Sequence, residues 1–427
     1  MTEPLLLFGS LILFLLLGIP VGIAVGVATA FAMVVHSDIP LTVIAQKSFS
    51  GLDSFPLLAI PFFMLAGQLM CVGGISKRIV NFAEHLIGFV IGGLGMVTVM
   101  ACMFFAAISG SAPATVSAIG SFMIPAMRER NYGGGFAAAL TAAAGTIGVI
   151  IPPSIPFVIY CVLTSQSIGD LFLAGIVPGI LIGLSLMFVV FVIARKRGYK
   201  GSENAKKPTL KSFCTSFLDA FWALLMPLII LGGIYTGVFT PTEASVVGCV
   251  YAFFAGKFIY KELSWEGVRE ALREASVLNG ATQFLVGLSL AFGYYLTVAG
   301  IPQQLCEAVL ELTNNPIVIM LLINIFLLFV GCFVDNIAAM MILIPIMLPV
   351  LKAINYDILL FGVVITVNLA IGFCTPPFGI NLFVASAVSK EKIETITKDL
   401  VWFIGIMLVD LMLITYIPSI SLFLLGR

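Results

Sequence analysis

Two segments, IGVIIPP at 147–153 and IGFCTPP at 371–377, contain the two Pro-Pro pairs of this 427-residue chain. Proline has no N–H, so the carbonyl four residues earlier loses its helical hydrogen bond. The residue before each pair is also pushed out of the α region. Each segment is therefore predicted to interrupt a helix, although a simple proline kink is the alternative for either one. The freed carbonyls belong to Gly148 and Val149 in the first segment and to Gly372 and Phe373 in the second.

The composition around these segments is that of a membrane protein. Hydrophobic residues make up 60% of the chain and charged residues 10%, with a mean hydropathy of +1.16; a soluble domain has about 25% charged residues. In a bilayer, irregular backbone persists only where it is buried in protein or lines a cavity. The two interruptions are therefore expected to line such a cavity, where their carbonyls would suit Na⁺ and helix N-termini would suit anions.

Other classes of protein and site are disfavoured by the sequence. The net charge is zero, so nucleic acid is not an implied partner. The eight cysteines stand singly, and neither histidine has a neighbouring metal ligand, so we expect no zinc or iron site and no organic cofactor. The N-terminus has no basic region before its apolar stretch, and we do not interpret it as a cleaved signal peptide.

Polar breaks divide the chain into apolar segments of three kinds. Two regions, 86–127 and 316–351, have two short apolar arms around a small or polar centre and are expected to be re-entrant helical hairpins. Two others, 134–167 and 357–389, are the helices broken by Pro-Pro. A charged segment, 261–274, has the spacing of an interfacial amphipathic helix or an ordinary connecting helix, and 37–55 is its counterpart. The remaining helices are expected at 5–18, 20–36, 56–72, 171–194, 216–236, 241–260, 275–298 and 401–425.

The distribution of basic residues predicts the topology. The segment 195–215 holds seven Lys and Arg residues, and cytoplasmic loops carry an excess of these residues. With this linker in the cytoplasm, each hairpin entering and leaving on one side and each broken helix crossing once, nearly all of the 21 basic residues fall on the cytoplasmic side. Both termini then lie on the opposite side. The exceptions are Lys47, Lys352 and Arg427.

The two halves of the chain repeat each other. Pro152 and Pro376 are 224 residues apart, FMIPAM at 122–127 matches IMLPVL at 346–351 with the same offset, and Ser109 falls against Asp335. In the predicted topology the matched elements run in opposite directions, which is the inverted repeat common in secondary transporters. Chance similarity between apolar helices is the alternative. The predicted units are a first repeat at 1–194, the linker at 195–215 and a second repeat at 216–427.

The hairpin centres carry the polar residues. The first centre, SGSAPATVSAIG at 109–120, offers hydroxyl oxygens and small residues that allow close backbone approach. The second has Asp335 and Asn336 at the matching place. An ionised carboxylate costs several kcal/mol or more within a bilayer, so Asp335 is a functional candidate. A helix cap is its alternative role, and for Glu243 in TPTE (240–243) a capping box is the preferred one.

These motifs together resemble the large membrane subunit of TRAP transporters, the tripartite ATP-independent periplasmic systems. The resemblance rests on the SGSAPAT tip, the TPTEA motif, the IPP and TPPFG breaks and the repeat, and it covers essentially the whole chain. It implies an all-α elevator-type transporter of the ion-transporter superfamily in the bacterial inner membrane. It also implies Na⁺-coupled uptake of an organic acid, with sialic acid favoured and C4-dicarboxylate next. The implied partners are a periplasmic binding protein and a small membrane subunit of about four helices, expected as a separate polypeptide.

The resemblance also implies the site residues. Sodium sites are expected where hairpin tips meet helix breaks, with Asp335 beside the second. Substrate contacts are expected between the tips. The implied sodium residues are Ser109, Ser111, Gly145, Gly148 and Ile151 in the first half and Gly331, Gly372, Thr375 and Phe378 in the second. The implied substrate residues are Thr115, Ser154, Asp335, Asn336 and Asn381.

Three other functions fit the sequence less well. A stand-alone Na⁺/dicarboxylate symporter of the same superfamily would lack the TPTEA and SGSAPAT motifs. An intramembrane enzyme needs a catalytic pair, and Asp335 has no partner acid at comparable depth. A channel needs a ring of ligands rather than paired breaks. The sequence leaves the solute, the ion stoichiometry and the oligomeric state open.

Overall fold

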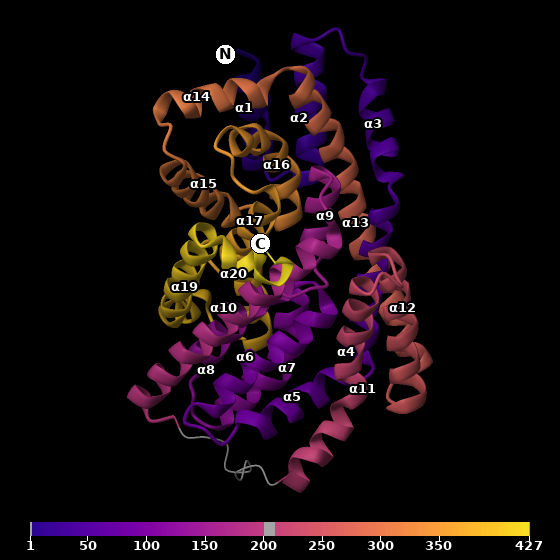
Figure 1. The fold of residues 1–427 in the computed structure, drawn as a ribbon, viewed down its shortest axis with the longest axis vertical. Coiled ribbons are helices and arrows are strands. Elements are labelled where there is room, and N and C mark those ends of the chain that lie inside the picture. The colour runs from indigo at the N-terminus through magenta and orange to yellow at the C-terminus, as the bar shows by residue number, and fades with distance from the viewer. Residues whose placement is uncertain (1, 200–209, 427) are drawn as a thin grey trace.

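The computed structural model describes residues 2–199 and 210–426, and within these ranges the chain is helical without strands. Seven helices of the described part are long and apolar enough to cross a membrane. The molecule is elongated, with α14 (Ile301–Leu312) across one end and α5 (Ile75–Ile87) near the other (Figure 1).

The elements of the two halves follow in the same order. The starts of α7 and α16 (112 and 336) and of α8 and α17 (134 and 358) each differ by 224 residues. The first half contains α1 (Thr2–Leu16), α2 (Val21–His36), α3 (Thr42–Leu52), α4 (Ala59–Val72), α5, α6 (Gly93–Ser109), α7 (Ala112–Glu129), α8 (Gly134–Gly145), α9 (Ile155–Thr164) and α10 (Ile168–Arg197). The second contains α11 (Leu210–Tyr235), α12 (Pro241–Phe254), α13 (Trp265–Val298), α14, α15 (Pro316–Gly331), α16 (Asn336–Ala353), α17 (Ile358–Gly372), α18 (Ile380–Ser389), α19 (Ile393–Tyr416) and α20 (Pro418–Leu422).

Short turns join the paired helices α6–α7 and α15–α16. Gly110 ends α6 with φ +60°, a left-handed conformation that glycine adopts without a steric penalty. The second turn is longer and runs from Cys332 to Asp335. The two halves interlock here, because α7 packs against α18 and α16 packs against α9. Each hairpin therefore contacts the broken helix of the other half.

Both helix interruptions lie where the Pro-Pro pairs predict them. After α8 the chain makes one 3₁₀ turn (Thr146–Val149), and α9 starts at Ile155. In the second half the interruption separates α17 from α18. Both Pro-Pro peptide bonds are cis. The arms before the interruptions, α8 and α17, are buried, and the interruptions bring irregular backbone into the middle of the protein.

Several predicted boundaries were wrong. The amphipathic segment at 261–274 is not a separate helix, since α13 continues unbroken into the next apolar stretch. The predicted linker at 195–215 is helical at both ends, where α10 continues to Arg197 and α11 starts at Leu210. The last long helix, α19, starts eight residues before the predicted 401 and ends at Tyr416. Lys200, Lys206, Lys207 and Arg427 lie outside the described residues.

Helices α5 and α14 were not predicted. Helix α5 connects α4 to the α6–α7 pair, and α14 connects α13 to the α15–α16 pair. Both are amphipathic rather than uniformly apolar. In α5, Ile75, Ile79 and Val80 are buried while Lys77 is exposed. A search for long apolar runs misses such helices, whereas apolar residues spaced three and four positions apart would reveal them.

The capping box predicted at the start of α12 is present. The Thr240 N–H donates to Glu243 Oε2 at 2.8 Å, and the Glu243 N–H donates to Thr240 Oγ1 at 3.3 Å. Glu243 therefore has the structural role that the sequence favoured.

Candidate functional site

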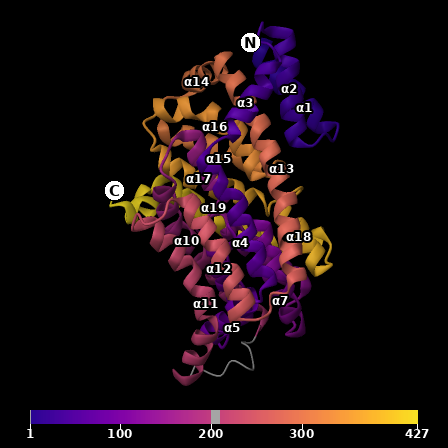
Figure 2. The same cartoon turned by 90° about the vertical axis from the view of Figure 1, so that its right-hand side faces the viewer.

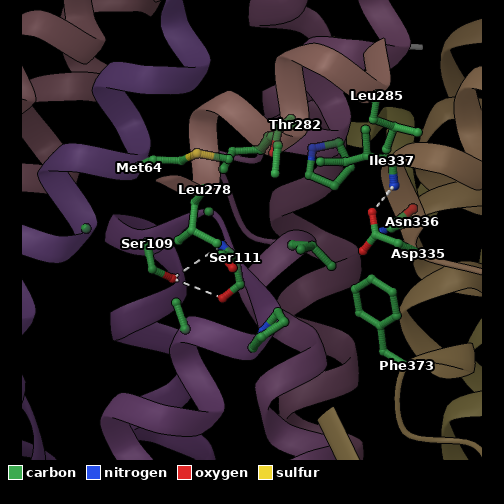
Figure 3. Close-up of a pocket in the computed structure, with 18 of the residues that line it drawn as sticks. Met64, Ser109, Ser111, Leu278, Thr282, Leu285, Asp335, Asn336, Ile337 and Phe373 are labelled. Atoms are coloured by element: carbon green, nitrogen blue, oxygen red, sulfur yellow. Dashed lines mark hydrogen bonds between the residues drawn. The ribbon is translucent and has the colours of Figure 1, made fainter. Parts of the chain in front are cut away.

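A cavity of about 620 Å³ lies between the two hairpin turns and helices α2, α4 and α13. One wall comes from α2, α4 and α13, and the other comes from the hairpin turns and the helix interruptions. Figure 3 shows Ser109 and Ser111 on one side of this cavity and Asp335 and Asn336 on the other, with Leu278 and Thr282 of α13 between them. The turns of both halves thus face one shared space.

The first turn is held by hydroxyl groups. Ser109 Oγ and Thr115 Oγ1 are 2.9 Å apart, and Thr115 Oγ1 donates to the Ser111 carbonyl at 2.8 Å. The Ser111 N–H points to Ser109 Oγ at 3.4 Å. Thr115 is fully buried beneath the turn and does not line the cavity. These bonds gather three oxygen atoms at the tip of the hairpin.

The first interruption approaches this turn through a glycine. A Cβ on Gly148 would lie 2.5 Å from Thr115 Oγ1 and 2.7 Å from the Ser111 carbonyl oxygen, so no larger residue fits without displacing the turn. Gly145 packs in the same way on Val116 of α7. Ile151 instead packs against Gly179 of α10, where a Cβ would come within 2.3 Å of Ile151 Cγ1. The structure therefore brings Ser109, Ser111 and Gly148 together.

The second turn places Asp335 at the N-terminus of α16. Asp335 Oδ2 accepts the Ile337 N–H at 3.1 Å, so the carboxylate caps the helix while it also lines the cavity. The neighbouring Asn336 is 1% exposed and lines the cavity. Neither its Oδ1 nor its Nδ2 has a hydrogen-bond partner among the described residues. Because buried amides are nearly always paired, two unpaired amide atoms in a cavity lining are unusual. Both are available to a ligand.

The second interruption meets its own turn through two glycines. A Cβ on Gly372 would lie 2.4 Å from the Gly331 carbonyl carbon, which means that the two backbones are in direct contact. Thr375 Oγ1 donates back to the Ile371 carbonyl at 2.8 Å. Phe378 is 56% exposed, and its ring lies 5.8 Å from that of Phe333. Gly331, Gly372 and Asp335 thus belong to one neighbourhood, whereas the Phe378 side chain lies at its edge.

The freed carbonyls are partly re-bonded, and differently in the two halves. Ser154 Oγ donates to the Val149 carbonyl at 2.6 Å. The Thr375 N–H reaches the Gly372 carbonyl at 3.0 Å, and the Asn381 N–H reaches the Phe373 carbonyl at 2.9 Å. Among the described residues, no hydrogen bond reaches the Gly148 carbonyl. Since a carbonyl oxygen has two lone pairs, the bonded ones retain capacity for an ion.

Three predicted substrate residues lie away from the cavity lining: Thr115 beneath the first turn, Ser154 and Asn381. Ser154 is buried and caps α9, with its hydroxyl used by Val149. Asn381 is buried in α18 and donates from Nδ2 to the Ala142 carbonyl at 3.1 Å, which links the broken helices of the two halves.

Sequence reasoning missed the scaffold wall of the cavity. Gln68 of α4 and Thr282 of α13 line it beside apolar residues such as Met64. Gln68 is an isolated polar residue in an apolar helix, and this pattern could have marked it, whereas Thr282 is one of several polar residues in its part of α13. Their place opposite the hairpin turns was not visible in the sequence because it depends on how distant helices pack.

The cavity lining contains no Lys, Arg or His among the residues that the structure describes. Asp335 is the one charged side chain among the described lining residues, so any attraction for an anion must come from backbone. Residues of the first turn of α7, α9 and α16 line the cavity. Helix N-termini present free N–H groups and a partial positive charge of roughly +0.5, which favours anions.

A bundle of apolar helices with a cavity between its two halves is the architecture of a membrane transport protein. The chain matches the family described as "Tripartite ATP-independent periplasmic transporter, DctM component" over residues 8–420. It therefore belongs to this family, and it is a transport permease rather than an enzyme.

Three relatives and one solved structure illustrate the similarity. The isethionate TRAP transporter permease protein DctMQ of Oleidesulfovibrio alaskensis is 45% identical over 99% of this chain and 67% of the relative. The C4-dicarboxylate large permease DctM of Rhodobacter capsulatus is 38% identical over 98% of each chain. The sialic acid large permease SiaM of Vibrio cholerae is 40% identical over 95% of each chain. The YdaH transporter of Alcanivorax borkumensis shares the fold, with a TM-score of 0.60 and 13% identity over 88% of this chain and 86% of that one.

Proposed function

We propose that this chain is the large membrane subunit of a Na⁺-coupled TRAP transporter that imports an organic acid. The observation that carries the proposal is the pairing of two hairpin turns with two interrupted helices around one cavity. Each turn contacts an interruption through glycine, and both turns line the same space. Such paired sites in the two halves of a repeat are where secondary transporters bind ions and substrate.

Sodium would bind beneath the two turns. In the first half, oxygen ligands are available from Ser109, Ser111 and the carbonyl of Gly148. In the second, they are available from Asp335 and from the carbonyls at Gly331 and Gly372. Oxygen atoms of this kind suit hard cations. A cation at each turn would also add positive charge next to the substrate cavity.

The substrate would be an organic anion bound between the turns. In the absence of a basic side chain, its acidic group would be stabilised by the α7 and α16 N-termini and by nearby Na⁺. The amide of Asn336 would supply donors that otherwise have no partner. The relatives transport isethionate, C4-dicarboxylate or sialic acid by their names. The 45% identity to the isethionate permease supports isethionate as a further candidate beside the sialic acid favoured from the sequence, and a cavity of about 620 Å³ has room for any of the three.

Transport would proceed by an elevator motion. The mobile unit would consist of hairpins α6–α7 and α15–α16 with the broken helices α8–α9 and α17–α18. The scaffold would include α2, α4 and the helices of 216–298. In this proposal residues 1–194 and 216–427 are repeats inserted in opposite orientations, and both termini face the periplasm.

The proposed partners are a small membrane subunit and a periplasmic binding protein. The name DctMQ belongs to a relative of which this chain covers 67%, so the small subunit can be fused to a large one in that protein. We propose that this chain works with such a subunit, separate or fused. The binding protein would deliver the anion to the periplasmic face.

Uptake into proteoliposomes tests the proposal. The chain is reconstituted with its small subunit and supplied with the binding protein and a labelled panel of isethionate, a C4-dicarboxylate and sialic acid. We expect uptake of one of these that requires an inward Na⁺ gradient and the binding protein. Equal uptake without the binding protein would favour the alternative, a stand-alone Na⁺/dicarboxylate symporter. Uptake that is indifferent to Na⁺ would reject the coupling.

A further inference from the structure

A second acid is buried in the protein, away from the cavity. Asp410 of α19 is 2% exposed. Ser185 of α10 donates to its Oδ1 at 2.9 Å. Its Oδ2 is buried and has no hydrogen-bond partner among the described residues. Neither residue lines the cavity, and the proposed transport mechanism uses neither.

Ser185 and Asp410 occupy equivalent positions of the two repeats. The helices α10 and α19 start at residues 168 and 393, and both these starts and the two residues differ by 225. When equivalent positions of two related halves touch each other, their contact lies on the axis that relates the halves. The hydrogen bond between Ser185 and Asp410 is thus a direct link across the centre of the repeat.

Among the described helices packed on α19, no basic side chain lies near Asp410. Of the elements packed on α19, the described helices α8, α17, α18 and α20 contain no ionisable residue. The ionisable residues of α10 lie at the ends of that helix. The nearest of them, Arg195, is ten residues from Ser185, or about 15 Å along the helix axis. On α19 itself, Tyr416 lies about 9 Å from Asp410 along the helix axis, and the other ionisable residues of this helix lie farther away. The groups concerned are Asp170, Arg195, Lys196 and Arg197 on α10 and Glu394, Lys398, Asp399 and Tyr416 on α19.

From this geometry we propose that Asp410 binds a proton and is a neutral acid in the folded protein. An ionised carboxylate with one hydroxyl partner and no cation would carry the full cost of burial, several kcal/mol in real proteins. One proton on Oδ2 removes that cost. A metal ion is disfavoured because the two side chains offer three oxygen atoms, whereas hard cations take about six. The proton site therefore joins the two halves at their axis and is independent of the proposed Na⁺ sites.

Infrared difference spectroscopy tests this directly. The full chain is purified from membranes into lipid nanodiscs with any subunit that copurifies, and wild type is compared with Asp410→Asn at neutral pH. We expect the variant to lose a carbonyl band of a protonated carboxylic acid. In Ser185→Ala the same band should persist and move to higher frequency, because the hydroxyl no longer donates to Oδ1. Loss of a carboxylate band in Asp410→Asn would overturn the proposal.

Two further measurements guard against a trivial result. Asp399→Asn serves as the matched control, because Asp399 pairs with Arg197 at 2.5 Å near the end of the same helix and should lose a carboxylate band. If Asp410→Asn does not fold, the frequency shift of the carboxylic acid band in Ser185→Ala still shows whether Asp410 is protonated. The melting temperature of wild type should also fall at alkaline pH, because loss of the proton creates an uncompensated buried carboxylate. The melting temperature of Asp410→Asn should fall less. An equal fall in both would count against the site.

Discussion

Single residues at the turns decide how closely each hairpin approaches its broken helix. Gly148 and Gly372 both touch the backbone of a turn, so the contact depends on the absence of a side chain. The polar residues differ between the halves. Hydroxyl groups hold the first turn, whereas Asp335 caps and charges the second. This asymmetry permits two ion sites of different charge in one repeated architecture.

Replacing Gly148 with Ala should weaken the apparent Na⁺ affinity of transport. The new Cβ would lie 2.5 Å from Thr115 Oγ1 and would push the first turn away. Overpacking of this kind costs about 1–3 kcal/mol, which corresponds to a roughly 5- to 150-fold loss of affinity if the strain falls on the bound state. The measurement is the Na⁺ dependence of uptake. Gly405→Ala is the control, because its Cβ meets nothing within 4 Å and should leave the Na⁺ dependence unchanged. An unchanged Na⁺ dependence in Gly148→Ala would remove this glycine from the site.

Two substitutions at Asp335 separate its charge from its capping role. Asp335→Asn keeps an oxygen that can accept the Ile337 N–H, whereas Asp335→Ala removes it at a cost of about 1 kcal/mol in helix stability. If the charge serves the ion, both variants should lose most Na⁺-driven uptake. The melting temperature should fall more in Asp335→Ala. Wild-type uptake by Asp335→Asn would leave Asp335 as a structural cap.

Among the elements, α5 shows how a connecting helix is anchored. Arg78 of α5 donates to Glu262 at 2.8 Å and to the Gly74 carbonyl at 2.9 Å, and its guanidinium lies 3.9 Å from the centre of the Tyr260 ring. It also lies 3.4 Å from Asp219 of α11. A single side chain thus ties α5 of the first half to two segments of the second.

Removing this anchor should destabilise the protein. Arg78 is largely buried, so Arg78→Ala leaves Glu262 without its partner, and hydrogen bonds to charged groups contribute about 1.5–3 kcal/mol. The expected result is a lower melting temperature in detergent or nanodiscs. Lys77→Ala changes the exposed neighbour on the same helix and should have little effect. Equal melting of both variants would show that the cluster contributes nothing measurable.

Local sequence patterns predict much of this fold, whereas the remaining features depend on how distant helices pack. The Pro-Pro pairs, the small-residue turn after Ser109 and the capping box at Thr240 each act over a few residues, so the sequence predicts them. Helix α5 escaped because its pattern is amphipathic rather than apolar. The bond from Ser154 to the Val149 carbonyl and the facing of Gln68 toward the turns depend on folded geometry, which spacing along the chain does not contain.

At the scale of the whole molecule, the two halves are interlocked rather than side by side. Hairpin helix α7 packs on α18, α16 packs on α9, and α10 meets α19 at their equivalent positions. Figure 2 shows α13 and α4 running along the side of this core. In the proposed elevator motion this interlocked unit would move as one body. The cavity lies between it and helices α2, α4 and α13, which the proposal assigns to the scaffold.

Two cross-links test that motion. A Cβ on Gly293 of α13 would lie 3.6 Å from Cγ of Pro345 in α16, across the proposed boundary between scaffold and mobile unit. A Cβ on Gly120 of α7 would lie 3.7 Å from Cγ1 of Val388 in α18, within the proposed mobile unit. Both contacts are made to a γ atom, the position that a cysteine sulfur occupies, so we expect oxidation to bridge both double-cysteine variants, and mass spectrometry of the oxidised proteins checks this first.

The two bridges should differ in their effect on transport. Because the first bridge joins parts that slide past each other, oxidation of Gly293→Cys/Pro345→Cys should stop uptake and reduction should restore it. The second joins parts that move together, so oxidised Gly120→Cys/Val388→Cys should retain most of its reduced activity. The single variants, treated in the same way, account for the native cysteines. Full uptake with the first bridge closed would mean that α13 and α16 keep their contact throughout the cycle, and the boundary between scaffold and mobile unit would have to be drawn elsewhere.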